Sequence, residues 1–78
     1  MKKNVTVYSK DGCYYCVMAK NYLDKHGIDY EVVNVSKAPE AMQEMVTATG
    51  QKGVPQLKIG DKWVVGFNAR QIWKSLEE

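Results

Sequence analysis

The first 35 residues follow a strand, helix, strand pattern, and this unit restricts the possible folds more than any other stretch. Apolar and β-branched residues alternate with polar ones over 4–8, which predicts a strand, and 28–35 predict a second. A helix over 14–26 is indicated by an apolar stripe at helical spacing, made of Cys16, Ala19 and Leu23. Such a unit has a right-handed crossover and parallel strands. Residue 13 then lies at the carboxyl end of the first strand, where open α/β sheets place their sites.

The rest of the chain predicts a helix, a hairpin and a final helix. Residues 36–49 form the helix, with Pro39 tolerated in its first turn. The pair Gly60-Asp61 between two β-like runs, 56–59 and 62–65, signals an antiparallel hairpin. The last helix follows a capping residue, Asn68, and its apolar stripe is Ala69, Ile72, Trp73 and Leu76. We therefore expect one α/β domain over 1–78, with the order βαβαββα and a four-stranded mixed sheet that carries helices on both faces.

The segment Cys13-Tyr14-Tyr15-Cys16 contains the only two cysteines of the chain. Two thiols at this spacing can alternate between a dithiol and a disulfide, and a helix N-terminus favours negative charge on the first of them. Only the thiolate attacks a disulfide. Cys13 has the free N–H groups of the helix start ahead of it, whereas Cys16 falls on the inward stripe. We therefore predict that Cys13 is the nucleophile and Cys16 the resolving cysteine.

Charge and length exclude several other classes of protein. The net charge of the chain is only +2, and acidic and basic residues are interspersed along it. No basic block therefore indicates a nucleic acid or a membrane surface as partner. The apolar alternation after Lys2 and Lys3 stops at Ser9. This run is too short to be the apolar central region of a signal peptide. We expect a cytoplasmic monomer, and in that compartment a CxxC pair is catalytic or metal-binding more often than a permanent crosslink.

A metal site is the alternative interpretation of the cysteine pair. Zinc needs two further ligands, and the only histidine, His26, lies ten residues beyond Cys16 on the same predicted helix, about 15 Å away. One chain cannot close such a site, so we predict no metal ligands within it. Two chains that share four cysteines around zinc or an iron–sulfur cluster remain an alternative of a different functional class.

Three short segments, taken in order, carry a resemblance to a known family. They are Val7-Tyr8-Ser9-Lys10 before the cysteine pair, Gly53-Val54-Pro55 before the hairpin, and Gly66-Phe67 before the last helix. From Val5 to about Leu76 the chain resembles the glutaredoxin-like branch of the thioredoxin superfamily. The resemblance implies a thioredoxin fold and a cis Pro55 that faces the cysteines. It also implies that the backbone N–H and C=O of Val54 bind a substrate chain as an added strand would.

The resemblance leaves two reductants in competition. Dithiol glutaredoxins usually have Cys-Pro-Tyr-Cys, Thr-Val-Pro, and a Gly-Gly followed by an Asp that helps to hold glutathione. The corresponding positions here are Tyr14, Gly53, Phe67 and Asn68-Ala69. The Gly66-Phe67 pair is more similar to NrdH-type redoxins, which thioredoxin reductase recharges. The preferred interpretation is a small dithiol electron carrier for protein disulfides, without a cofactor beyond its cysteine pair, and the alternative is a glutathione-dependent glutaredoxin.

Further residues are expected to bind substrate around the cysteines. Lys10 can stabilise the thiolate or bind a carboxylate, as its family counterpart does for glutathione, or it can be an ordinary solvated lysine. We expect Tyr14 at the exposed rim and Tyr15 packed against the sheet or lining the groove. The predicted substrate-binding set is Lys10, Tyr14, Tyr15, Val54, Pro55, Gly66 and Phe67. Trp63, Phe67 and Trp73 are expected in the core or the groove wall, and His26 at the helix end.

Overall fold

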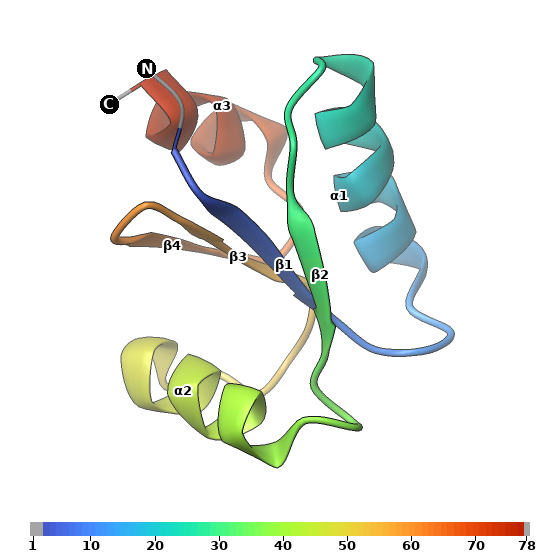
Figure 1. The fold of residues 1–78 in the computed structure, drawn as a ribbon, viewed down its shortest axis with the longest axis vertical. Coiled ribbons are helices and arrows are strands. Elements are labelled where there is room, and N and C mark those ends of the chain that lie inside the picture. The colour runs from blue at the N-terminus through green and yellow to red at the C-terminus, as the bar shows by residue number, and fades with distance from the viewer. Residues whose placement is uncertain (1–2, 78) are drawn as a thin grey trace.

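Four strands form one mixed sheet in the computed structural model, which describes residues 3–77 (Figure 1). Strand β1 lies in the middle of the sheet order β2-β1-β3-β4, parallel to β2 and antiparallel to β3, which in turn pairs with β4 in an antiparallel hairpin. The elements are β1 (Val5–Ser9), α1 (Tyr14–Lys25), β2 (Glu31–Asn34), α2 (Pro39–Thr49), β3 (Gln56–Ile59), β4 (Lys62–Val65) and α3 (Ala69–Glu77). The predicted order and sheet type are confirmed.

Helices cover both faces of this sheet, α1 and α3 on one side and α2 on the other (Figure 1). Successive residues of β1 point to opposite faces, so Val7 lies in the core under α1 and α3, whereas Tyr8 lies in the core under α2. The larger core comprises Val5, Val7, Ala19, Leu23, Leu57, Ile59, Val64 and Ile72. The smaller one comprises Tyr8, Val35 and Met45. The predicted stripe of α1 is buried, and it fixes which face of that helix points away from solvent.

The starts of β2 and α2 differ most from the predictions, while other ends shift by a single residue. The second strand starts at Glu31 because the Ile28 N–H donates to the Leu23 carbonyl, which makes residue 28 part of the end of α1. Helix α2 begins at Pro39, since residues 35–37 form a turn after β2 in which the Lys37 N–H donates to Asn34. The helix ends at Gly50, whose φ of 72° is in the left-handed region and whose N–H donates to Val46 at 2.7 Å.

The surface of α3 contains a second departure from the sequence expectation. Trp73 is 41% exposed, and the fully buried side chain of this helix is Ile72. The ring centroids of Trp73 and His26 are 5.1 Å apart, and those of His26 and Tyr22 are 4.5 Å apart. The prediction that Trp73 is core or groove wall is therefore wrong, because this ring covers the end of α1 from outside. No helix within residues 3–77 combines the length and apolarity that crossing a bilayer requires.

Candidate active site

The two cysteines lie where β1 has ended and α1 begins. The chain turns between these elements at Gly12, whose φ is 76°. Cys13 is the N-cap residue of α1, and its Sγ accepts a hydrogen bond from the Cys16 N–H at 3.2 Å. Cys13 and Cys16 form a disulfide with their Cα atoms 5.2 Å apart. Only 1% of Cys16 is exposed, whereas Cys13 is partly exposed, so the first sulfur is the more accessible one.

The surroundings of Cys13 favour negative charge on its sulfur once the pair is reduced. The Cys16 N–H points at Sγ, and the N-terminal end of α1 carries the positive end of the helix dipole. The first turn of α1 contains no acidic side chain that would oppose this effect. A thiolate at the N-cap therefore gains a hydrogen bond and a favourable helix field.

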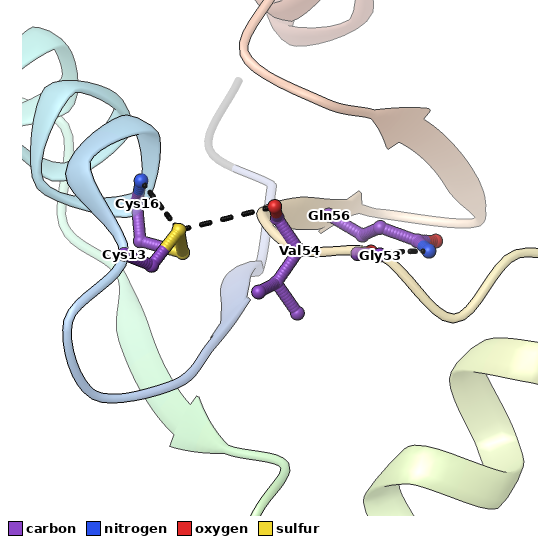
Figure 2. Close-up of a disulfide and its surroundings, with 5 residues drawn as sticks. All are labelled: Cys13, Cys16, Gly53, Val54 and Gln56. Atoms are coloured by element: carbon purple, nitrogen blue, oxygen red, sulfur yellow. Dashed lines mark hydrogen bonds between the residues drawn. A yellow bond between two sulfur atoms is a disulfide. The ribbon is translucent and has the colours of Figure 1, made fainter.

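The segment before β3 reaches the cysteines from the other side of the site. Figure 2 shows the side chains of Cys13 and Cys16 pointing toward Val54, whose carbonyl oxygen lies 3.8 Å from the Cys13 Sγ. The Val54–Pro55 peptide bond is cis, as the family resemblance implied, and Pro55 is buried. The Pro55 carbonyl accepts the Gly66 N–H at 2.8 Å. This bond ties the segment to the end of β4 and leaves the Val54 backbone beside the sulfur.

Gln56 fixes the backbone before Pro55 by hydrogen bonds, a role that the sequence predictions did not identify. Its side chain is 0% exposed, and its Nε2 donates to the carbonyl oxygens of Gln51 and Gly53 at 2.9 and 3.0 Å. Figure 2 shows the side chain directed away from the cysteines, toward the Gly53 backbone. The Oε1 atom has no hydrogen-bond partner within residues 3–77. One feature of the sequence could have indicated this role. Gln56 is a polar residue directly after Pro55, at the start of a predicted strand, and a buried polar side chain needs hydrogen-bond partners.

A polar network links α2 to strands β1 and β3 of the sheet. The Tyr8 hydroxyl donates to Glu44 Oε1 at 2.9 Å, and Lys58 Nζ lies 3.2 Å from Glu44 Oε2. Burial, followed by the hydrogen bond and the charge of Glu44, raises the pKa of Tyr8 to about 12. The pKa of Glu44 is lowered by the bonds it accepts from Tyr8 and Lys58. The Tyr8 ring lies 5.0 Å from Trp63, and both pack in the cluster that Val54 contacts.

The remaining predicted site residues differ in where they lie. Lys10 is exposed and lines a cleft together with Cys13 and Tyr14, and Tyr14 is 70% exposed, which places it at the rim as expected. Tyr15 is 59% exposed, with its ring 5.5 Å from that of Tyr14. Packing against the sheet, the first of the two places predicted for Tyr15, is wrong, since the residue after it, Cys16, takes the inward position of this helical turn. The second, lining a groove, is not met in the cleft that Lys10 and Tyr14 line, because Tyr15 is not part of its wall.

Phe67 lies farther inward than a substrate-binding residue at the rim would. It is partly buried against the core under α1 and α3, with its ring 6.1 Å from that of Tyr22. The next residue, Asn68, accepts the Gln71 N–H on its Oδ1 at 3.2 Å, as the predicted helix cap does. Of the predicted set, Lys10 and Tyr14 line the same cleft as Cys13, and the Val54 carbonyl lies beside the Cys13 sulfur. Gly66 joins this site through its hydrogen bond to the Pro55 carbonyl.

A mixed four-stranded sheet, a cysteine pair at a helix N-terminus and a cis proline against it define a protein of the thioredoxin-like redox class. The glutaredoxin family model matches residues 5–64, and the chain belongs to this family. It is therefore a thiol-disulfide oxidoreductase of the glutaredoxin and redoxin type.

Similar proteins come from several bacteria. A glutaredoxin of Neisseria meningitidis serogroup A is 41% identical over 66 residues, which are 83% of this chain and 78% of the relative. A glutaredoxin-like 8.6 kDa protein in a rubredoxin operon of Clostridium pasteurianum is 35% identical over 74 residues, or 95% of this chain and 99% of the relative. The solved structure of the NrdH-redoxin from Escherichia coli superposes with a TM-score of 0.81 at 31% identity, and the match covers 91% and 92% of the two chains.

Proposed function

We propose that this protein is a dithiol electron carrier that reduces disulfides of other proteins, with Cys13 as nucleophile and Cys16 as resolving cysteine. The observation that carries the proposal is the placement of the two sulfurs. Cys13 accepts an N–H bond at the helix start and is partly exposed, while Cys16 is buried directly behind it. The pair itself carries the electrons, and no other cofactor takes part. A cytoplasmic location belongs to the same proposal.

The exchange takes two steps, and its electrons balance. The Cys13 thiolate attacks one sulfur of the substrate disulfide, which forms a mixed disulfide and releases the other substrate sulfur as a thiolate that takes up a proton. Cys16 then loses its proton and attacks the Cys13 sulfur. This step closes the Cys13–Cys16 disulfide and releases the second substrate thiolate. Two electrons pass to the substrate, and both sulfurs of the protein are oxidised.

A lowered thiol pKa is in general a small source of rate in such exchange reactions. For CxxC motifs as a class, a change from about 8.5 to about 7 raises the thiolate fraction at pH 7 about sixteenfold, and the lower nucleophilicity of the thiolate cancels about fivefold of this gain. The larger share comes from Cys16, because the two Cα atoms are 5.2 Å apart and the second attack is intramolecular. Cys13 also leaves readily as a stabilised thiolate in that step.

The substrate chain binds mainly through its backbone. An electron carrier for varied disulfides needs contacts that every peptide shares, and the Val54 carbonyl lies beside the reacting sulfur. Lys10 and Tyr14, which line a cleft with Cys13, and Gly66, which is hydrogen-bonded to Pro55, contribute further contacts. Tyr15 and Phe67, which complete the predicted substrate-binding set, contribute through exposed ring surface and through support of Gly66, respectively.

The reductant in this proposal is a flavoenzyme of the thioredoxin reductase type. Dithiol glutaredoxins hold glutathione with a carboxylate after their Gly-Gly pair. Here Phe67, Asn68 and Ala69 occupy these positions, and none of them carries a charge. Phe67 packs inward and the Asn68 side chain caps α3. The resemblance of Gly66-Phe67 to NrdH-type redoxins points the same way, and glutathione is the alternative reductant.

NADPH consumption with a protein disulfide as substrate tests this proposal. Two reactions run in parallel, one driven by thioredoxin reductase and one by glutathione with glutathione reductase, and Cys13→Ser is the inactive control. We expect turnover with the flavoenzyme and little with glutathione. Turnover with glutathione alone contradicts the proposed reductant. Visible absorbance or bound zinc in protein purified without oxygen contradicts the dithiol mechanism and supports a metal-binding dimer.

A further inference from the structure

A cleft of about 530 Å³ lies beside the cysteine pair, between the start of α1 and β2. We refer to it as the α1–β2 cleft. On the helix it is lined by Tyr14 at the rim and by Cys13, Cys16, Val17 and Lys20, which recur at the spacing of one helix face. Val32 and Asn34 of β2 line it from the sheet side. Cys13 thus faces Val54 with its sulfur and also forms one end of this cleft.

The charge of the α1–β2 cleft is predominantly positive. Two lysines, Lys10 and Lys20, line it, and within residues 3–77 the structure pairs neither with a carboxylate. The one acidic residue of the lining, Asp11, accepts a hydrogen bond from the Asn34 amide at 3.2 Å. The amide does not neutralise Asp11, but the two lysines outnumber this carboxylate, so the lining still attracts a carboxylate that enters from outside.

Part of the cleft wall is apolar and open to solvent. Val17 and Val32 are each 47% exposed, and they come from two different elements. Strand β2 is at the edge of the sheet, paired only with β1, so no neighbouring strand crowds its valine. Exposed apolar side chains that face one another across a groove provide contact area for a bound chain.

We infer that the α1–β2 cleft binds an acidic segment of the substrate protein next to the cysteine that reacts with Cys13. The inference rests on the proposed function and adds the class of substrate to it. Lys20 lies seven residues after Cys13, about 10 Å along the helix, which is about three residues of extended chain. The preferred substrate thus has a carboxylate about three positions from its cysteine and an apolar residue between them, against Val17 and Val32.

Two synthetic peptides test this inference. Each has one cysteine in mixed disulfide with thionitrobenzoate, and they differ only in Glu or Lys three positions from that cysteine. Release of the chromophore by the reduced protein gives both rates, and their ratio is insensitive to the general reactivity of a variant. We expect the acidic peptide to react about two- to fivefold faster, which is the effect of one exposed ion pair. The ratio should fall toward one at about 0.5 M salt.

Lys20→Glu and Lys25→Glu form a matched pair of variants. Both change the net charge equally on the same helix, but Lys25 is exposed in the last turn and does not line the cleft. We expect Lys20→Glu to abolish or invert the preference and Lys25→Glu to keep it. Val32→Thr, which preserves the shape of the side chain, should slow both peptides and leave the ratio unchanged.

Several results would overturn the inference without touching the proposed function. Equal rates for the two peptides in the unmodified protein would do so, since both are still reduced. A preference that survives Lys20→Glu and disappears in Lys10→Glu assigns the carboxylate to Lys10 alone, as for a glutathione-like ligand. Equal loss in Lys20→Glu and Lys25→Glu assigns it to overall charge. Failure to reduce either peptide contradicts the proposed function itself.

Discussion

Gln56→Glu replaces the amide nitrogen of a fully buried side chain by an oxygen and hardly changes its size. That nitrogen donates to the Gln51 and Gly53 carbonyls at 2.9 and 3.0 Å, so the substitution brings a third oxygen against two others. A protonated carboxyl donates one hydrogen bond to them, and an ionised one donates none. We therefore expect a loss of stability that depends strongly on pH.

The size of the effect follows from two contributions. Loss of one net hydrogen bond costs about 1 kcal/mol even when the introduced carboxyl is protonated. Keeping it protonated at pH 7, from an ordinary pKa of about 4.3, costs up to about 3.7 kcal/mol more. Burial raises the folded-state pKa of the introduced group, so stability is retained below about pH 4.3 and is lost as pH rises. The variant should lose about 1 kcal/mol near pH 4 and about 4 to 5 kcal/mol at pH 7.

Urea unfolding followed by tryptophan fluorescence measures this difference against the unmodified protein at each pH. Gln56→Met is the control, because it removes both donors and also the unpartnered Oε1 without adding a titrating group. It should lose about 1 to 2 kcal/mol, because both hydrogen bonds are gone, and this loss should be the same at every pH. A Gln56→Glu variant whose destabilisation is the same at pH 4 and pH 7 would refute the assignment of Nε2 as the donor to both carbonyls.

Two further predictions concern the network under α2 and the turn after β4. The folded pKa of Tyr8 is about 12 against about 10 unfolded, so its contribution is complete below pH 10 and decreases by about 1.4 kcal/mol per pH unit between pH 10 and 12. Tyr8→Phe should lack this decrease in unfolding measurements, and an unchanged slope contradicts the network. Gly66→Ala should cost about 1 to 2 kcal/mol at its φ of 82° and slow disulfide reduction, because the Gly66 N–H holds Pro55. Gly53→Ala is the control, because an added Cβ there meets no atom within 4 Å, and it should change neither stability nor the rate of disulfide reduction. Equal effects of the two substitutions would refute the role of the turn at Gly66.

Local patterns predicted most of the fold. The spacing of Cys16, Ala19 and Leu23 determines the buried face of α1, and a Gly-Asp pair between two β-like runs determines the hairpin. The place of the cysteines follows from the strand, helix, strand order alone. These features depend on neighbours within a few residues, and such neighbours are visible in the sequence.

The parts of the site that sequence did not predict depend on contacts between distant segments. Gln56 acquires its role only when residues 51–53 fold back over it. Tyr15 turns outward because the sheet admits a single narrow stripe of the short helix α1. Trp73 contacts His26, which belongs to a helix far earlier in the chain. The α1–β2 cleft likewise exists only where α1 and the edge strand meet.

Trapping of the mixed disulfide tests the central claim most directly. Reduced Cys16→Ser protein, mixed with a protein disulfide, should accumulate a covalent complex through Cys13, because the first attack occurs and the resolving thiol is missing. Peptide mass spectrometry identifies the linked cysteine. Cys13→Ser protein should accumulate no such complex, since Cys16 is only 1% exposed. A complex that forms through Cys16 in Cys13→Ser protein, and not through Cys13 in Cys16→Ser protein, would contradict the account.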